Sequence, residues 1–382
     1  MSSLTEYEGR LWERTPLIFS DSISARLNAN VYLKLENLQP SQCFKQRTQS
    51  LLAHKIYSQP THGAGNTHFV IASGGNAALC LAVACSQLEG AKLTVFVPEK
   101  TRGSALLDEL GRYGAIVVIH GKTFPEAVEK ALEFVKTNPD TVFMPASDHP
   151  TLCEGASSIV DEIEEQLPVG SGAPDAIVCS VGGGSLIGGL MIGCDRCSWA
   201  STRIIAMEAI GADTLYHSVL LNESPIHANK LAPGAEVVQN EEYSVQLVTR
   251  MPTSKATSLG ARVTSANVLS KILSRRKQEK NAVTCVDVPD ELGMEGCLGF
   301  ADEHKTLVDL ACGVALAMAY KPKLFREVFA KELDKPKKPT VVFVVCGGFL
   351  VALKDMLEYS KHLQSREGQE MEAFVESHSV VI

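Results

Sequence analysis

The sequence predicts an α/β protein with two lobes, each built on a mainly parallel sheet flanked by helices. Short apolar runs alternate with segments of helical periodicity along most of the 382 residues. This alternation is typical of parallel sheets whose strands are joined by helices. The chain is longer than the ~150 residues of a usual domain. Its 45% content of hydrophobic residues allows a sizeable core.

The first alternating series gives one lobe. Periodicity and apolar runs predict strands at 68–72, 93–97, 116–119 and 142–144, and helices at 77–88, 101–112 and 126–137. Pro125 stands at a favourable first helical position, and Gly114 follows the end of the preceding helix.

The second series gives the other lobe. It begins with a helix at 154–167, continues with strands at 176–179, 203–207 and 341–345, and includes helices at 258–280 and 311–320. We expect a long loop over 217–240, which has little periodicity, and no regular structure in the polar tail 365–382. Between the lobes we expect a cleft at the carboxyl ends of parallel strands, where such folds bind ligands.

Charge and cysteine content narrow the class of protein. A net charge of -8 argues against nucleic acid or an anionic membrane as the main partner. The most apolar run, 341–353, contains two glycines and is shorter than the ~20 residues of a membrane helix. The first fourteen residues do not resemble a secretory signal. The 11 cysteines lack metal-binding spacing, so we expect a reducing, cytoplasmic compartment rather than disulfides or zinc.

Three glycine-rich breaks each follow a predicted strand and precede a helix. They are Ala72–Ala77, Val181–Ser185 and Cys346–Gly348. Backbone amides at a helix N-terminus attract anions, and glycine lets the backbone approach closely. Gly182–Leu186 is the best candidate for a phosphate cradle, although a tight turn between strand and helix would give the same local pattern.

A dinucleotide-binding fold also has a glycine loop after a strand and an acid at the end of the next one. Glu208 ends the next predicted strand and satisfies the second condition. The spacing G-x-G-x-x-G fails, however, because its last glycine, counted from Gly182, would fall on Ile187. The sequence therefore argues against NAD(P) as the ligand.

Lys45 follows an aromatic residue, Phe44, and stands ahead of a predicted helix. A lone lysine in such a place is usually a surface residue, and only the other motifs of the chain change that interpretation. An ordered set of motifs accompanies it: Lys34–Ser41, Phe44–Lys45, Ser73–Ala77, Glu154–Ser158, Ser180–Gly184, Met207–Glu208, Ala311–Leu316 and Cys346–Gly348. From Thr15 to Gly348, the chain resembles the serine/threonine dehydratase (ammonia-lyase) family of fold-type II pyridoxal-phosphate enzymes.

This resemblance implies a two-lobed, tryptophan synthase β-like fold. A large cofactor-binding domain would comprise 1–38 and 147–382, and a small substrate-side domain 39–146. The implied reaction is β-elimination on L-serine or L-threonine, which gives a 2-oxo acid and ammonia. The resemblance also implies a small amino acid as substrate and a homodimer as the assembly.

The resemblance assigns roles to single residues. Lys45 is similar to the lysine that carries pyridoxal 5'-phosphate as a Schiff base and then acts as the base. Phe44 resembles the residue that packs on the pyridine ring, Asn76 the one that hydrogen-bonds its 3-hydroxyl, and Cys346 the one that faces its nitrogen. For Cys346 a buried apolar cysteine is the alternative. The phosphate loop would consist of Gly182, Gly183, Gly184, Ser185 and Leu186.

Two further sites rest on the resemblance. The loop that holds the substrate carboxylate would consist of Ser73, Gly74, Gly75, Asn76 and Ala77. A potassium-type cation site would combine the Glu208 carboxylate with backbone carbonyls around Gly182, Ala212 and Ala261. An ordinary acid at a strand end is the alternative interpretation of Glu208.

The chain departs from the family pattern next to these motifs. Gln42 and Thr48 replace glycines, Cys43 replaces a serine, Asp309 replaces a glutamate and Phe349 replaces a small polar residue. We expect most of these positions to border the cofactor or substrate, and therefore expect slow turnover of L-serine and L-threonine. The alternatives are β-replacement, racemisation, elimination on an unusual amino acid, or a catalytically silent paralogue.

Overall fold

The computed structural model describes residues 10–59 and 67–382, so residues 1–9 of the expected large domain lie outside it. The strands are β1 (Leu17–Phe19), β2 (Asn30–Lys34), β3 (His68–Ala72), β4 (Lys92–Val97), β5 (Ile116–Ile119), β6 (Thr141–Phe143), β7 (Ala176–Ser180), β8 (Arg203–Ala209), β9 (Glu236–Asn240), β10 (Val245–Thr249), β11 (Val283–Val288), β12 (Thr340–Val344), β13 (Glu372–Val375) and β14 (His378–Val381).

The α-helices are α1 (Asp21–Leu27), α2 (Lys45–Tyr57), α3 (Asn76–Ser86), α4 (Ala105–Arg112), α5 (Phe124–Thr137), α6 (Pro150–Gln166), α7 (Ser185–Arg196), α8 (Thr214–Glu223), α9 (Ala266–Gln278), α10 (Asp290–His304), α11 (Leu310–Tyr320), α12 (Pro322–Leu333) and α13 (Leu353–Ser365). Short 3-10 turns are η2 (Glu36–Leu38), η3 (Glu99–Thr101), η4 (Pro225–Lys230) and η5 (Thr257–Leu259). No helix of the described ranges is long and apolar enough to cross a membrane.

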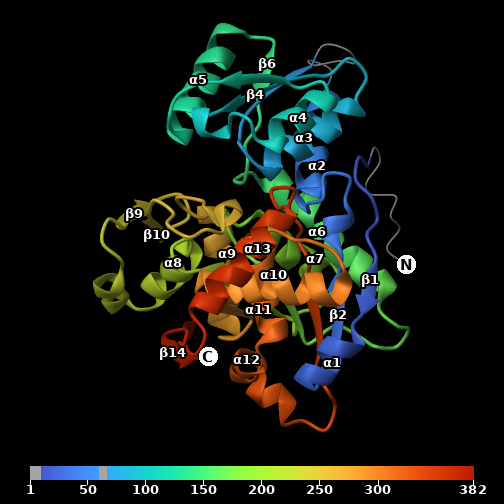
Figure 1. Ribbon diagram of the computed structural model, residues 1–382, viewed down its shortest axis with the longest axis vertical. Coiled ribbons are helices and arrows are strands. Elements are labelled where there is room, and N and C mark those ends of the chain that lie inside the picture. Colours follow the sequence, from blue (N-terminus) through green and yellow to red (C-terminus); the bar gives the residue numbers. More distant parts are fainter. Residues whose placement is uncertain (1–9, 60–66) are drawn as a thin grey trace.

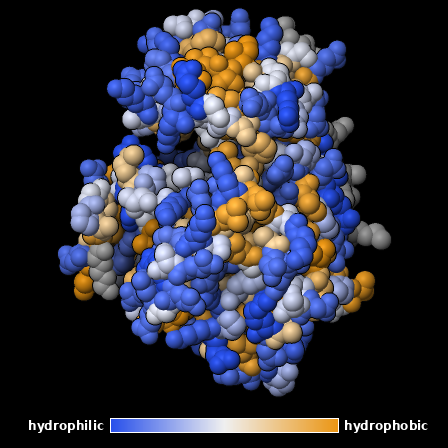
Figure 2. Space-filling view, viewed as in Figure 1, coloured by the Kyte–Doolittle hydropathy of each residue, from blue (hydrophilic) through white to orange (hydrophobic). Residues whose placement is uncertain are grey.

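The strands form two main sheets, one in each lobe (Figure 1). The upper lobe contains the parallel sheet β5-β4-β3-β6, and the lower lobe the sheet β1-β2-β12-β7-β8-β11-β13-β14. The larger sheet is parallel from β2 to β11 and antiparallel at both edges. The predicted α/β class, with two mainly parallel sheets flanked by helices, is confirmed. A notch separates the two lobes on the molecular surface (Figure 2).

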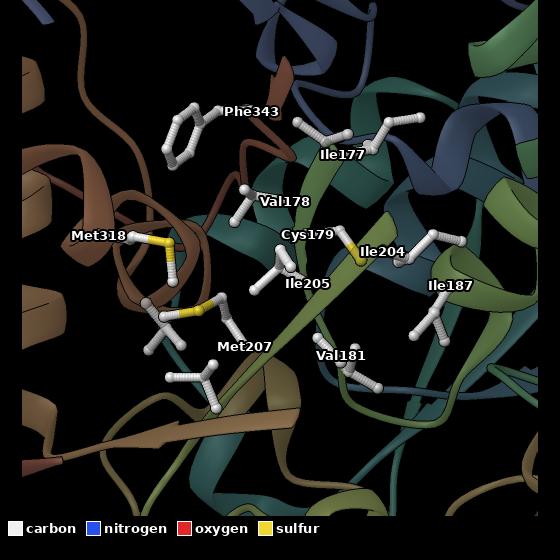
Figure 3. Packing of buried hydrophobic residues seen from close by; sticks show 14 of the residues in the cluster. Ile177, Val178, Cys179, Val181, Ile187, Ile204, Ile205, Met207, Met318 and Phe343 are labelled. Atoms are coloured by element: carbon white, nitrogen blue, oxygen red, sulfur yellow. The ribbon is translucent and has the colours of Figure 1, made fainter. Parts of the chain in front are cut away.

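The centre of the large sheet is apolar on both faces, as its uninterrupted hydrophobic runs predict. In Figure 3, Val178, Met207 and Phe343 lie on the side of Met318 from α11. Ile204 lies on the opposite side, toward Ile187 of α7. All six residues are buried. Helices cover both faces, so the functional groups are left at the strand ends.

Four sequence expectations are wrong in detail. The tail 365–382 was expected to lack regular structure, but β13 and β14 extend the large sheet, because alternate side chains such as Ala373 and Val375 are buried against it. The expected loop 217–240 contains the end of α8, η4 and β9. Of the helix expected at 258–280, only α9 forms. The segment 101–112 was expected to be one helix, but Gly103, with φ +75°, separates η3 from α4 there.

A buried cluster of four charges joins elements from distant parts of the chain. The Arg47 guanidinium of α2 donates to Glu36 at 2.7 Å and to Glu162 of α6 at 2.7 Å. Lys34 of β2 donates to Glu162 at 2.6 Å and to the carbonyl oxygen of Thr15 at 2.7 Å. All four charged side chains are 0–1% exposed. Two positive and two negative charges therefore compensate one another away from water.

We predict that Arg47→Met lowers the free energy of unfolding by about 3–5 kcal/mol, because two buried carboxylates lose their partner. The control is Arg112→Met in the Arg112–Glu109 pair, where Arg112 is 74% exposed. An exposed pair contributes only about 0–1 kcal/mol. Urea unfolding followed by circular dichroism measures both changes, and equal effects of the two substitutions would contradict the prediction.

Candidate active site

A cavity lies at the carboxyl ends of β7 and β12, where the two lobes meet. It is lined by Cys43, Phe44, Lys45, Asn76, Ser147, Ser180, Val181, Gly182, Gly183, Gly184, Ser185, Leu186, Ile187, Ser258, Leu259, Asp309, Ala311, Cys346 and Gly347. The structure therefore brings together the predicted cofactor residues: Phe44, Lys45, Asn76, the loop 182–186 and Cys346.

Lys45 is the first residue of α2, and backbone contacts tie the segment before it to the end of β12. The amide of Phe44 donates to the carbonyl oxygen of Cys346 at 3.1 Å, and the amide of Gly348 donates to that of Gln42 at 2.7 Å. Gly347, with φ +76°, has no room for a side chain, because a Cβ there would lie 2.1 Å from the Gln42 oxygen. These contacts place Lys45 and Cys346 in one cavity although about 300 residues separate them.

The loop between β7 and α7 is a closely packed cradle. A Cβ on Gly183 would lie 2.6 Å from the Cβ of Ser147, and one on Gly182 would lie 3.1 Å from the Leu259 backbone. Gly184 has φ +102°, which side chains disfavour. The helix α7 begins directly after it, so the first-turn amides and the helix dipole favour a bound anion here.

Asn76, the first residue of α3, is held in a polar group on the cavity wall. Its Nδ2 lies 3.3 Å from Ser258 Oγ and 3.3 Å from Asp309 Oδ2, while its Oδ1 accepts from the Phe349 amide at 2.9 Å. Burial raises the pKa of Asp309, while hydrogen bonds from the Cys312 amide, Ser258 and Asn76 oppose that rise. Asn76 is therefore fixed in orientation by its partners.

The Cys346 thiol faces the same cavity and lies 3.3 Å from Ser180 Oγ. A hydrogen bond with the Cys312 thiol, together with burial, raises the pKa of Cys346 well above its usual value. Cys346 therefore remains a neutral thiol near neutral pH, able to take part only in weak hydrogen bonds.

The residues expected to bind a substrate carboxylate lie in the turn between β3 and α3 and in the first two positions of α3. Of these, Asn76 lines the cavity, whereas Ser73, Gly74, Gly75 and Ala77 are not among its lining residues. The amide of Gly75 donates to Ser73 Oγ at 3.3 Å.

The departures from the family pattern divide into two groups. Cys43 and Asp309 line the cavity, as expected. Gln42 and Thr48 do not: the Gln42 side chain is exposed, and Thr48 is buried in α2 with its hydroxyl bonded to the carbonyl oxygen of Lys45 at 2.9 Å. Phe349 is likewise not among the lining residues, so three of the five departures lie outside the cavity lining.

The residues expected to form a cation site do not all line the cavity. Both oxygens of Glu208 accept backbone hydrogen bonds at the start of α8, from Leu215 at 3.0 Å and Tyr216 at 2.6 Å. Gly182 lines the cavity, whereas Ala212 and Ala261 do not. Potassium binding at this place stays a prediction.

Sequence reasoning missed two polar residues of the cavity, Ser147 and Ser258. Asp309 was expected near the cofactor or substrate, because it stands where the family has glutamate, but its contact with Asn76 could not be read from the sequence. Ser147 and Ser258 lie in segments without a motif and reach the cavity only through the fold.

The arrangement suits a phosphorylated, carbonyl-bearing cofactor. It combines an amine on Lys45, an anion cradle at 182–186, the aromatic ring of Phe44 and a neutral thiol on Cys346. The model for pyridoxal-phosphate dependent enzymes matches residues 10–347, and the chain belongs to this family.

Within the family, the chain is similar to L-serine dehydratases. It is 31% identical to the human L-serine dehydratase/L-threonine deaminase over 350 residues, which cover 92% of this chain and 95% of the relative. It is 30% identical to the Saccharomyces cerevisiae L-serine dehydratase, covering 92% and 98%. The solved L-serine ammonia-lyase from Rhizomucor miehei superposes with a TM-score of 0.75 at 27% identity, covering 92% and 98%.

We predict that Gly183→Ala weakens binding of pyridoxal phosphate at least tenfold, because the new methyl group would lie 2.6 Å from the Cβ of Ser147. The double variant Gly183→Ala, Ser147→Gly removes the clash and should regain most of the affinity. Titration of the apoprotein, followed by the visible absorbance of the bound cofactor, measures this. As a control, Gly111→Ala introduces a methyl group with no atom within 4 Å and should bind normally. Loss of affinity that the double variant does not restore would contradict the steric explanation.

Proposed function

We propose that this chain is a pyridoxal-phosphate-dependent ammonia-lyase that acts by β-elimination on a small β-hydroxy amino acid of the L-serine or L-threonine type, giving a 2-oxo acid and ammonia. The observation that carries this proposal is the meeting of Lys45, the cradle 182–186 and Cys346 around one cavity. The names of the human, yeast and fungal relatives, which are L-serine dehydratases or ammonia-lyases, support the same reaction.

In this proposal Lys45 holds the cofactor covalently, the amides of 182–186 hold its phosphate, and Phe44 and Asn76 contact its ring. When bound, the cofactor supplies an electron sink for negative charge on the substrate Cα. Once the substrate amine displaced it from the cofactor, the Lys45 amine would be free to take the Cα proton. The turn 73–77 binds the substrate carboxylate through its amides.

The neutral thiol of Cys346 favours elimination over transamination. A carboxylate facing the ring nitrogen would hold it protonated, and a thiol with a raised pKa cannot. The amides of 182–186 would hold the cofactor phosphate, which would supply the proton that the departing β-hydroxyl needs. The protein thereby limits how far negative charge is delocalised and favours expulsion of the leaving group.

We also propose the large domain 1–38 and 147–382 and the small domain 39–146, supported by the separation of the two sheets.

A homodimer is supported by exposed Leu353 and Leu357, one turn apart on α13, and light scattering tests it. A cytoplasmic location is supported by the absence of disulfides among the 11 cysteines. Potassium at Glu208 would be tested by replacing it with a bulky organic cation in activity assays.

A second candidate is another pyridoxal-phosphate reaction, such as β-replacement, racemisation or elimination on an unusual amino acid. Cys43 and Asp309 favour it, because both differ from the family pattern and both line the cavity. A catalytically silent paralogue is the remaining alternative. Ammonia release from a panel of amino acids, with products identified by mass, separates these possibilities.

We predict that the purified protein is yellow and that borohydride fixes the cofactor on Lys45, as peptide mapping would show. Lys45→Ala should abolish ammonia release. Lys55→Ala is the matched control, because Lys55 lies on the same helix but forms an exposed pair with Glu154. A label on another lysine, or equal loss of activity in both variants, would overturn the assignment.

We predict that L-serine is turned over slowly and that Cys43→Ser raises kcat/KM for it. A regained hydrogen bond of about 0.5–1.5 kcal/mol corresponds to roughly 2–10-fold. Gln42→Gly is the control, because Gln42 has φ +57° and an exposed side chain. That change should leave the kinetics unchanged and raise the Tm. Serine turnover at ordinary metabolic rates without any gain in Cys43→Ser would show that this departure is neutral.

A further inference from the structure

A second cluster of titratable side chains lies at the carboxyl ends of β8 and β11. Asp213 precedes α8, His217 lies on its first turn, and Asp287 is in β11. One ligand atom from each residue can be chosen so that all lie within 4.8 Å of one another. None of the three lines the cavity of the candidate active site.

Asp287 shares a side-chain hydrogen bond with Asp213, but one of its own oxygens has no partner among the described residues. Its side chain is buried, at 3% exposure, and the oxygen without a partner is Oδ1. Burial, and then the nearby carboxylates of Asp213 and Glu208, raise the pKa of Asp287. A buried carboxylate oxygen without a donor is costly, and a cation placed between the carboxylates removes that cost.

The balance of charge around Asp287 favours a cation at this place. Glu208 stands directly beside Asp287 in the parallel register of β8 and β11. Arg250 ion-pairs with Asp213 at 2.8 Å and supplies a positive charge to the group. When His217 is neutral, the Arg250 guanidinium is the positive ion-pair partner that the described structure gives these carboxylates, so ionisation of a second carboxylate adds negative charge that a cation can offset.

His217 is oriented as a metal ligand would be. Its Nδ1 lies 2.8 Å from Nε2 of His227, and its Nε2 lies 3.5 Å from an oxygen of Asp213. If Nδ1 donates its proton to His227, the lone pair of Nε2 points toward the carboxylates. Metal-bound histidines are commonly held in this way by a second group on the other ring nitrogen.

We propose that Asp213, His217 and Asp287 bind a divalent transition-metal ion of the zinc class. Imidazole together with carboxylate selects such an ion over potassium or magnesium, which prefer oxygen ligands alone. The ligand set differs from the monovalent site expected at Glu208, which uses backbone carbonyls. The ion joins α8 to β11 and stabilises this end of the large sheet, and it takes no part in the reaction.

The test uses the full-length protein loaded with pyridoxal phosphate and freed of metal by a chelator. Calorimetric titration with Zn²⁺ should show one site per chain, and Zn²⁺ should raise the Tm. His217→Gln and Asp287→Asn should each remove this site. His227→Gln should weaken it about 10–100-fold, because it alters only the group that orients the ligand. The same titrations with potassium should show no competition.

His362→Gln is the matched control, because His362 also contacts a carboxylate, Glu291 at 3.0 Å, at the surface. It should bind Zn²⁺ like the natural chain. If Asp287→Asn does not fold, His217→Gln decides the question, because His217 is partly exposed. The proposal is overturned if the natural chain binds no stoichiometric Zn²⁺, or if His217→Gln binds it unchanged. Binding is measured without turnover, so failure here is separate from failure of the proposed reaction.

Discussion

The position of Lys45 depends on the buried guanidinium of Arg47, two residues further along the same helix. Glu36 and Glu162 fix this guanidinium from two different elements. The backbone of α2 is also in direct contact with α6, because a Cβ on Gly155 would lie 2.5 Å from the Arg47 oxygen. Any rotation of α2 that moved Lys45 would separate charges that water cannot reach, so the cluster restricts the helix to one placement.

The other fixed point is the end of β12. Its backbone hydrogen bonds to the segment before α2 set the cavity without involving side-chain chemistry. The consequence is visible at Gln42: it can replace a glycine despite its positive φ, because its side chain points to solvent and its backbone contacts are retained. Substitutions at such positions change strain and stability, whereas Cys43 and Asp309 change the surface that a ligand meets.

The sequence predicted those parts of the fold whose signal is local. The strand Ala176–Ser180 and its glycine loop were predictable, because a short apolar run followed by glycines and a helix rarely forms any other structure. The hairpin of β13 and β14 was not, since each strand has four residues and only its pairing with β11 gives it a buried face. The helix α8 was missed because it is buried on most sides and lacks an amphipathic pattern.

The candidate site shows the same limit. Lys45 and the loop 182–186 belong to motifs and could be assigned from the resemblance, while the lining by Ser147 and Ser258 could not. The cluster of Asp213, His217 and Asp287 could not be predicted either. About 70 residues separate Asp287 from the other two, and only the parallel register of β8 and β11 brings them together. Local patterns identify a helix start or a cradle, but side chains that meet across strands require the fold.

The contacts of Asn76 show how the chain sets the chemistry of its cavity. The Phe349 amide is a donor, so the atom it meets on Asn76 must be the oxygen, and the amide NH2 is turned toward the cavity and Asp309. Asn76 therefore presents hydrogens, not a lone pair, to whatever lies beside it. A group that accepts these hydrogens is favoured in its ionised, oxyanionic form, as the 3-hydroxyl of a pyridoxal ring would be. The backbone amide of Phe349 determines this preference. The Phe349 side chain, which departs from the family pattern, does not.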